Sequence, residues 1–315
     1  MSKFLLLIYK ILSVIFLPIV IVIVFFRVFQ NKEINTRIKE RFAFSSAKRP
    51  KGNLIWINAS SIGEYLATVS LIKKIRKIKP KIKILLTTNT KTSALLAQKI
   101  TNKNIFHQFT PQDNPLIIKK FLNYWKPSLV IWMESEFWPI ILNETKKYGI
   151  KIILLNGRMS DKSFRNWSFF KFFFKEITSN FSLILTMSKI DKENFKKLGT
   201  KNVNFIGNLK FSNKELQYDQ ESEKRAKKII GNRHVWLAAS THHGEEIFAT
   251  RIHLKLKKEL NLKDLLTIIV PRNIKRTSKI KKKINSYVPL TELFQSKSIS
   301  QNTEIIIDDS IGQLE

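Results

Sequence analysis

The sequence predicts an α/β protein with two Rossmann-like domains, each built on a parallel sheet, behind an N-terminal apolar segment. From residue 51 onward, short apolar runs of strand length alternate with amphipathic segments of helix length, which is typical of βαβ units. The length of 315 residues fits two domains of ordinary size. A polar, charged stretch over residues 212–233 divides the pattern into two series. We therefore expect an N-terminal segment at 1–30, a first domain at 31–211 and a second at 212–315.

The apolar runs give the expected strands. In the first series they cover residues 54–58, 82–88, 105–109, 129–133, 152–156, 183–187 and 203–206, and in the second series 235–239, 266–270 and 304–307. Helical spacing is clear between them, for example at 116–125 and 138–148. Three strands are few for an α/β domain, so we expect the second domain to be incomplete.

The N-terminal segment predicts a membrane anchor. Residues 4–26 are apolar apart from Tyr9, Lys10 and Ser13, and about 20 apolar residues in a helix span a bilayer core. Lys10 could extend toward the nearer lipid–water interface. Arg27, Lys32 and further basic residues follow, and a basic flank tends to remain in the cytoplasm. These features predict a single-pass helix, with the remaining chain on the cytoplasmic face of the inner membrane.

Composition narrows the classes of function. The formal net charge is +32, which indicates an anionic partner such as a membrane surface or a phosphorylated ligand, or else a compositional excess of lysine without a partner. A nucleic-acid-binding protein should cluster its basic residues and carry a recognisable module. This chain spreads them and shows no such module, so that class is disfavoured. Cysteine is absent, which excludes disulfides and thiolate chemistry.

An aromatic, basic segment at 164–174 (FRNWSFFKFFF) allows two interpretations. It could be a buried helix, or an interfacial patch that docks on lipid. The residues themselves do not decide between them.

The most informative stretch is NLIWINASSIGEY, residues 53–65. It reads as a buried strand, a turn of small residues and a helix that opens near Glu64. This arrangement places one carboxylate at the carboxyl end of a parallel sheet, where open α/β folds bind ligands. The alternative is that Glu64 and Ser61 form a capping box and only stabilise their own helix.

Other polar clusters also follow predicted strands. They are residues 87–90 (TTNT), 134–136 (ESE), 156–158 (NGR), 207–210 (GNLK), 240–246 (STHHGEE) and 271–272 (PR). Glu134 and Glu136 would share one face of an extended strand end, and Ser240 and Thr241 could hold a phosphate at a helix N-terminus. The sequence contains no Walker A, HExxH or GxSxG motif, and a metal site is not expected.

The strings SSIGE, TTNT, FTPQD, KPSLVIWMESEFWP, NGRMS, GNLKF, WLAASTHHGEE, IIVPRN and DDSIGQLE occur in one order along nearly the whole chain. In this the sequence resembles the Kdo transferases of lipopolysaccharide synthesis in Gram-negative bacteria. The resemblance implies a GT-B glycosyltransferase with a membrane anchor. It also implies inverting transfer of 3-deoxy-D-manno-octulosonic acid (Kdo) from CMP-Kdo to the lipid A precursor, lipid IVA, with no metal or other cofactor.

The same resemblance assigns roles to residues. Glu64 matches the general base of the family, and Ser61, Gly63, Glu134 and Glu136 match positions on the acceptor side. The donor side is matched by Lys210, Ser240, Thr241, His242, Gly244, Glu245 and Arg272. The sequence departs from the family at Asn58, where histidine is common, at Gly157, where alanine is common, and at Phe137, where leucine is common.

The family's chain continues beyond the position of Glu315 with a glycine-rich loop and a glutamate that hold the donor. We therefore expect the 315-residue chain to lack part of its donor site. A non-catalytic remnant that keeps only the acceptor-binding domain is the alternative to an active transferase.

Overall fold

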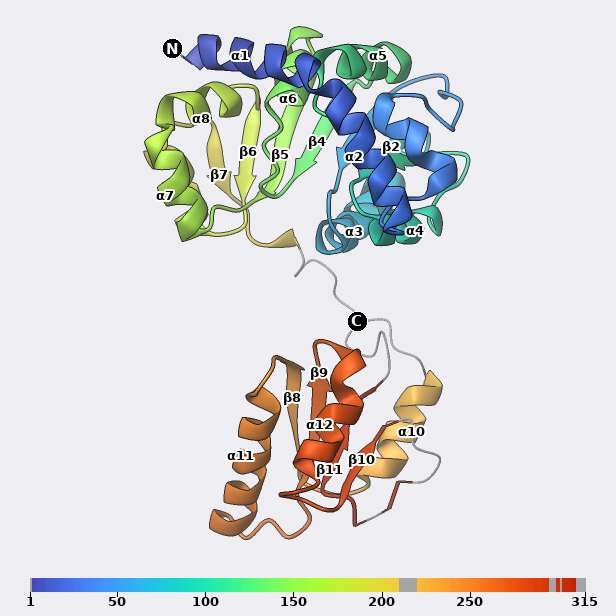
Figure 1. The fold of residues 1–315 in the computed structure, drawn as a ribbon, viewed down its shortest axis with the longest axis vertical. Helices are drawn as coiled ribbons and strands as arrows, with labels where there is room; N and C mark the ends of the chain where they lie inside the picture. Colours follow the sequence, from blue (N-terminus) through green and yellow to red (C-terminus); the bar gives the residue numbers. More distant parts are fainter. Residues whose placement is uncertain (1, 210–219, 295–298, 301, 310–315) are drawn as a thin grey trace. The chain divides into compact units, whose positions relative to one another are not determined.

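A computed structural model of the protein describes residues 2–209, 220–294, 299–300 and 302–309. The chain forms two compact units, Met1–Lys214 and Glu215–Glu315. Each unit contains one parallel sheet flanked by helices (Figure 1). The predicted α/β class with two Rossmann-like sheets is confirmed.

The first unit has a seven-stranded sheet in the order β3-β2-β1-β4-β5-β6-β7, and every neighbouring pair is parallel. The strands are β1 (Leu54–Asn58), β2 (Lys83–Thr88), β3 (Ile105–Phe109), β4 (Leu129–Met133), β5 (Lys151–Gly157), β6 (Leu183–Thr186) and β7 (Val203–Phe205). All seven correspond to predicted apolar runs, with ends that differ by no more than one residue.

Helices cover both faces of this sheet. They are α3 (Ile62–Ile78), α4 (Lys91–Gln98), α5 (Pro115–Trp125), α6 (Pro139–Lys147), α7 (Asp161–Phe169), α8 (Lys171–Thr178) and α9 (Lys189–Lys197). Successive strand residues point to opposite faces, so Trp56 and Trp132 enter one core with Phe121 of α5, while Ile57 enters a second core with Tyr65 of α3. Burial on both faces explains why the strands are continuous apolar runs.

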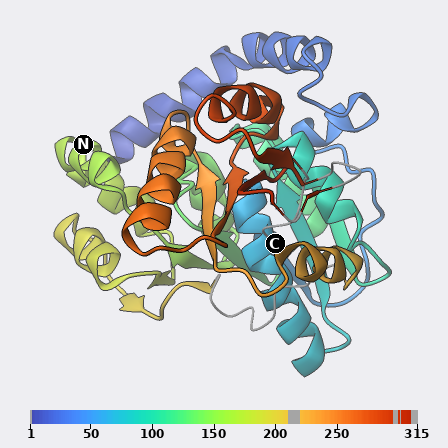
Figure 2. The same ribbon diagram turned by 90° about the horizontal axis from the view of Figure 1, so that it is seen from below.

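The N-terminal segment differs from the predicted single span. It forms two helices, α1 (Ser2–Ile15) and α2 (Leu17–Phe29), bent by 60° at the break between them. Pro18 has no backbone N–H to donate to the preceding turn, which favours a break there. Among the described helices none is individually long and apolar enough to cross a membrane, although this bent pair meets the length and composition criteria together. Figure 2 shows the pair running along the outside of the N-terminal unit.

Polar contacts fix α1 on the first unit, where it packs against α5, α6 and α8. The Lys10 ammonium donates to Asn143 Oδ1 at 2.7 Å and lies 2.5 Å from Glu144 Oε1 on α6. The Tyr9 hydroxyl donates to Asp113 Oδ2 at 3.1 Å. Lys10 therefore contacts the protein, and the expectation that it extends toward a lipid interface was wrong.

The aromatic segment is buried on one side and exposed on the other. It spans the end of α7 and the start of α8, which meet at Phe170. Phe174 is fully buried in the core, whereas Phe169 and Phe172 are 84% and 69% exposed. One side of the segment anchors it to the unit and the other presents aromatic rings to the surroundings.

The second unit has a four-stranded parallel sheet in the order β10-β11-β9-β8. Its elements are α10 (Gln220–Ile230), β8 (Val235–Thr241), α11 (Glu245–Glu259), β9 (Leu266–Pro271), η3 (Ile274–Arg276), α12 (Thr277–Ile284), β10 (Thr291–Leu293) and β11 (Ile305–Ile307). The expectation of three strands missed β10, because its sequence Thr-Glu-Leu contains one apolar residue and so forms no apolar run.

Candidate functional site

The candidate site lies at the carboxyl edge of the first sheet, where the strand order reverses. The chain passes from β1 outward to β2 and β3, then returns to place β4 on the other side of β1. Ligands of open α/β sheets bind at this switch point. Glu64 follows β1 and Glu134 follows β4, so the two carboxylates lie on either side of it.

Glu64 is held in place by the residues that begin α3. Ser61 is the N-cap, and its Oγ accepts a hydrogen bond from the Glu64 backbone N–H at 3.3 Å. The Ser61 hydroxyl in turn donates to Glu64 Oε1 at 3.1 Å, and the Ser60 backbone N–H donates to Oε2 at 2.8 Å. The carboxylate thus has the capping contacts considered above and also faces the switch point. Gly63 is the second residue of α3, so the helix begins earlier than predicted.

The environment of Glu64 alters its acidity. Its pKa is raised to about 7, mainly by burial and also by the negative charges of Glu134 and Glu136. The hydrogen bonds from Ser60 and Ser61 act in the opposite direction because they stabilise the charged form. Only 5% of the residue is exposed. A carboxyl group with a pKa near neutrality can take up a proton and release it at physiological pH.

The prediction that Glu134 and Glu136 share one face of an extended strand end was wrong. Glu134 has a left-handed backbone (φ 54°) that turns the chain at the end of β4. Its Oε1 accepts from Asn156 Nδ2 at 3.4 Å, and Glu136 Oε2 accepts from Trp138 Nε1 at 2.7 Å. Both still act electrostatically on Glu64, so the turn re-aims the acids without removing them from the site.

A groove opens beside the site. It has a volume of about 360 Å³ and lies between α2 and the loops that follow β2, β3 and β4. Its lining is apolar on the α2 side apart from Arg27 and mostly polar at the sheet edge. It consists of Val20, Ile23, Val24, Arg27, Glu33, Arg41, Asn89, Thr110, Pro111, Gln112 and Trp138. A second groove of about 320 Å³ along α1 and α2 shares Val20, Gln112 and Trp138 with it. Together they form an apolar wall that leads to the sheet edge.

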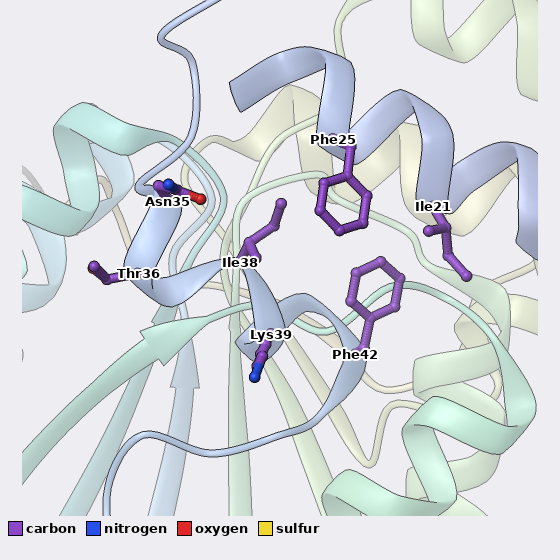
Figure 3. A pocket seen from close by; sticks show the side chains of 7 residues that line it. All are labelled: Ile21, Phe25, Asn35, Thr36, Ile38, Lys39 and Phe42. Carbon is purple, nitrogen blue, oxygen red and sulfur yellow. The ribbon is translucent and has the colours of Figure 1, made fainter. Parts of the chain in front are cut away.

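A third pocket lies on another side of α2, against η1 (Asn35–Phe42). Its volume is about 640 Å³. Figure 3 shows Phe25 and Ile21 of α2 facing Ile38 and Phe42 of η1. This pocket contains none of the residues that the sequence singled out.

The predicted donor residues lie in the second unit. Ser240, Thr241, His242, Gly244 and Glu245 form the end of β8 and the start of α11, and Arg272 follows β9, the neighbouring strand. The Arg272 backbone N–H donates to Thr241 O at 3.0 Å, which joins the two loops. Arg272 and His242 have exposed side chains. Lys210 lies outside the described residues.

Two backbone donors of the predicted phosphate loop already have partners. The His242 N–H donates to Glu245 Oε2 at 2.7 Å, and the Gly244 N–H donates to Glu246 Oε2 at 3.1 Å. Glu246 is buried and also pairs with Arg276. The N-terminus of α11 is therefore capped by its own acids, so the loop offers an anion mainly its exposed side chains.

Sequence reasoning missed several residues of the first unit that support the site. The Ser60 N–H donates to Glu64, the Asn89 side chain donates to Ser60, and Arg41 donates to the Asn89 carbonyl oxygen. Ser60 lay in the small-residue turn of the SSIGE string and Asn89 in the TTNT cluster after a strand, but neither was assigned a role, and Arg41 carried no signal of a role at the site. Within the described ranges, no group of three or more His, Asp or Glu residues is positioned to hold a metal ion.

Comparisons with known proteins identify the family. A family model described as 3-Deoxy-D-manno-octulosonic-acid transferase (kdotransferase) matches residues 36–213. A 3-deoxy-D-manno-octulosonic acid transferase of Rickettsia bellii is 39% identical over 86% of this chain and 64% of its own length. The enzyme of the same name from Rickettsia prowazekii is 32% identical over 98% of this chain and 76% of its own length.

Solved structures agree on the fold. UDP-GlcNAc 2-epimerase from Neisseria meningitidis bound to UDP-GlcNAc superposes with a TM-score of 0.57, at 12% identity over 84% of this chain and 73% of that one. A glycosyltransferase from Rickettsia africae gives a TM-score of 0.54, at 12% identity over 84% and 70%. At this identity the likeness shows the fold alone, which is of the GT-B type.

The chain thus matches the family model over more than half of its length, and it spans about two thirds of the relatives from Rickettsia bellii and Rickettsia typhi. The chain belongs to the 3-deoxy-D-manno-octulosonic acid transferase family.

Proposed function

We propose that the protein transfers Kdo from CMP-Kdo to the lipid A precursor lipid IVA, with inversion at the sugar carbon and Glu64 as the general base. The family membership supports the Kdo donor and the lipid acceptor. Transfer to a hydroxyl needs a base within hydrogen-bond reach of that hydroxyl, on the side opposite the leaving group. Glu64, in its ionised form, would accept the proton of the acceptor hydroxyl. The oxygen of that hydroxyl would attack the sugar carbon of Kdo as CMP departs.

The observation that carries this proposal is the environment of Glu64. A buried carboxyl group whose pKa is raised to about 7 lies at the switch point of the sheet. A base works best when its pKa is close to the working pH. A helix cap alone would be served equally well by an exposed carboxylate with an ordinary pKa.

The remaining residues would bind the two substrates. Ser61, Gly63, Glu134 and Glu136 are on the acceptor side of the proposal, and Lys210, Ser240, Thr241, His242, Gly244, Glu245 and Arg272 are on the donor side. Both substrates are anionic, which suits a chain with a net charge of +32. We further propose that transfer needs no metal, so an excess of EDTA should leave the rate unchanged.

We also propose that the protein acts at the cytoplasmic face of the inner membrane, held by α1 and α2. Their outward side chains support this: Phe26 and Phe29 of α2 are 59% and 86% exposed, and Leu7 and Ile11 of α1 about half. Apolar side chains at this density are stabilised by burial in lipid. Phe169 and Phe172 would add to the same surface.

The test is Glu64→Gln in the full-length protein, assayed with CMP-Kdo and lipid IVA. Loss of a general base should reduce kcat by roughly 10²-fold or more, with the melting temperature unchanged or higher. Glu193→Gln, an exposed glutamate with a 58% exposed side chain on α9, is the matched control and should retain full activity. Retained activity in Glu64→Gln would refute the assignment of the base. If the wild-type 315-residue chain has no activity in the same assay, the non-catalytic remnant is favoured instead.

A further inference from the structure

We propose that Ser60, clamped by the side-chain amides of Asn58 and Asn89, is a positioning residue that aims its backbone N–H at Glu64 and so fixes the orientation of the base. This inference rests on the proposed function of Glu64. The direct contact is the 2.8 Å hydrogen bond from the Ser60 N–H to Glu64 Oε2. Ser60 itself is 4% exposed.

The direction of the hydrogen bonds behind Ser60 follows from chemistry. The indole N–H of Trp56 can only donate, and it donates to Thr87 Oγ1 at 2.8 Å. The Thr87 hydroxyl therefore gives its own proton to Asn58 Oδ1, also at 2.8 Å. This orients the Asn58 amide, because its oxygen is turned toward Thr87 and its Nδ2 faces Ser60 Oγ at 3.4 Å.

A second hydroxyl confirms this orientation. Thr110 after β3 donates to the same Asn58 Oδ1 at 2.8 Å. Asn58, Thr87 and Thr110 are all buried and end or follow the adjacent strands β1, β2 and β3. The carboxyl ends of three strands are thereby joined by polar contacts, and such a network is rigid when every member is satisfied.

Asn89 holds Ser60 at two further points. Its Nδ2 donates to Ser60 Oγ at 3.1 Å, and its backbone N–H donates to Ser60 O at 3.3 Å. Asn89 is held in turn by the buried Arg41, whose Nη2 donates to Asn89 O at 2.6 Å. Arg41 pairs with the buried Glu33 at 3.0 Å. An unbroken series of contacts thus supports the peptide that faces Glu64.

The clamp should affect the base in two ways. It holds the carboxylate in one orientation, which a general base requires, and it stabilises the ionised form through the Ser60 N–H. The charged groups that act on Glu64 from the loop after the neighbouring strand β4 are Glu134 and Glu136, and both favour the protonated form of Glu64. If Ser60 became mobile, Glu64 would lose the hydrogen bond from the Ser60 N–H, while the charges of Glu134 and Glu136 would still act on it. The pKa of Glu64 would then rise.

The test uses Ser60→Ala and Asn89→Ala in the full-length protein. Each removes one side of the Ser60–Asn89 contact and leaves Glu64 in place. We expect kcat/KM to fall roughly tenfold and the acidic limb of the pH–rate profile to move up by about one pH unit. The double variant should be no worse than Ser60→Ala alone, because Ser60→Ala already removes the side-chain contact with Asn89.

Thr90→Ala is the matched control. Thr90 is adjacent to Asn89 and caps α4 through Ser93, with no hydrogen bond to Ser60. Its loss should cost stability of the order of a helix cap while the pH–rate profile stays in place. Asn89 is only half-buried, so Asn89→Ala tests the proposal even where Ser60→Ala folds poorly.

The outcomes separate the inference from the proposed function. An inactive Glu64→Gln together with unshifted profiles in both clamp variants would overturn the clamp alone. Rates that fall in parallel with melting temperature, with no shift of the acidic limb, would also overturn it, because the role would then be structural. An active Glu64→Gln would refute the assignment of the base and with it the basis of the clamp.

Discussion

Glu64 should make the stability of the first unit depend on pH, because burial raises its pKa in the folded protein. The ordinary value of 4.5 rises to about 7, so between these two pH values the folded chain keeps a proton that the unfolded chain has lost. Stability therefore falls as the pH increases through this window, and the full cost is present above pH 7. Below pH 4.5 both states are protonated and the group contributes nothing.

The size of the effect follows from the shift. One pKa unit corresponds to about 1.4 kcal/mol, so a shift from 4.5 to about 7 costs roughly 3 kcal/mol when Glu64 is ionised. Glu64→Gln is neutral at every pH, and its amide oxygen can still accept from Ser60 or Ser61. The variant should have a free energy of unfolding close to that of the wild type at pH 4.5 and be more stable by roughly 3 kcal/mol at pH 8.

Urea unfolding followed by tryptophan fluorescence measures this difference. The signal reports mainly on the first unit, which contains five of the six tryptophans: Trp56, Trp125, Trp132, Trp138 and Trp167. Glu193→Gln, with an exposed side chain, should show no such dependence on pH. If the stability gain of Glu64→Gln is the same at pH 4.5 and pH 8, then Glu64 does not carry a proton up to neutrality, and the argument for a tuned base fails.

Two further perturbations test the N-terminal helices. Lys10→Ala should lower the free energy of unfolding by about 1–3 kcal/mol, because it leaves the buried Glu144 without its main cation. Lys147→Ala removes the more exposed partner of the same carboxylate and should cost less. An equal loss of stability in both variants would show that the contact from α1 has no special weight. Phe169→Ser with Phe172→Ser should weaken sedimentation with anionic vesicles, most clearly at high salt, where charge attraction is screened. Phe205→Ser, at a 41% exposed ring on β7, is the control, and unchanged binding of the double variant would exclude these aromatic rings from the lipid contact.

The local pattern of the sequence determined the sheets. Leu54–Asn58, Ile105–Phe109 and Leu129–Met133 are strands with the predicted ends, because a strand buried on both faces must be a continuous apolar run and turn residues stop it. The same logic located Glu64, since a strand followed by a cap and a helix places its first carboxylate at the sheet edge. The prediction missed β10 because its sequence Thr-Glu-Leu is not an apolar run.

Tertiary structure decided the features that depend on partners distant in the sequence. Lys10 meets Glu144 on α6 and therefore does not extend toward lipid. The pKa of Glu64 depends on burial and on Glu134 and Glu136, some 70 residues away. The amides of Asn58 and Asn89 both reach Ser60 only because β1 and β2 are neighbours in the sheet. Sequence spacing sets which residues reach a sheet edge, whereas strand order sets which of them touch there.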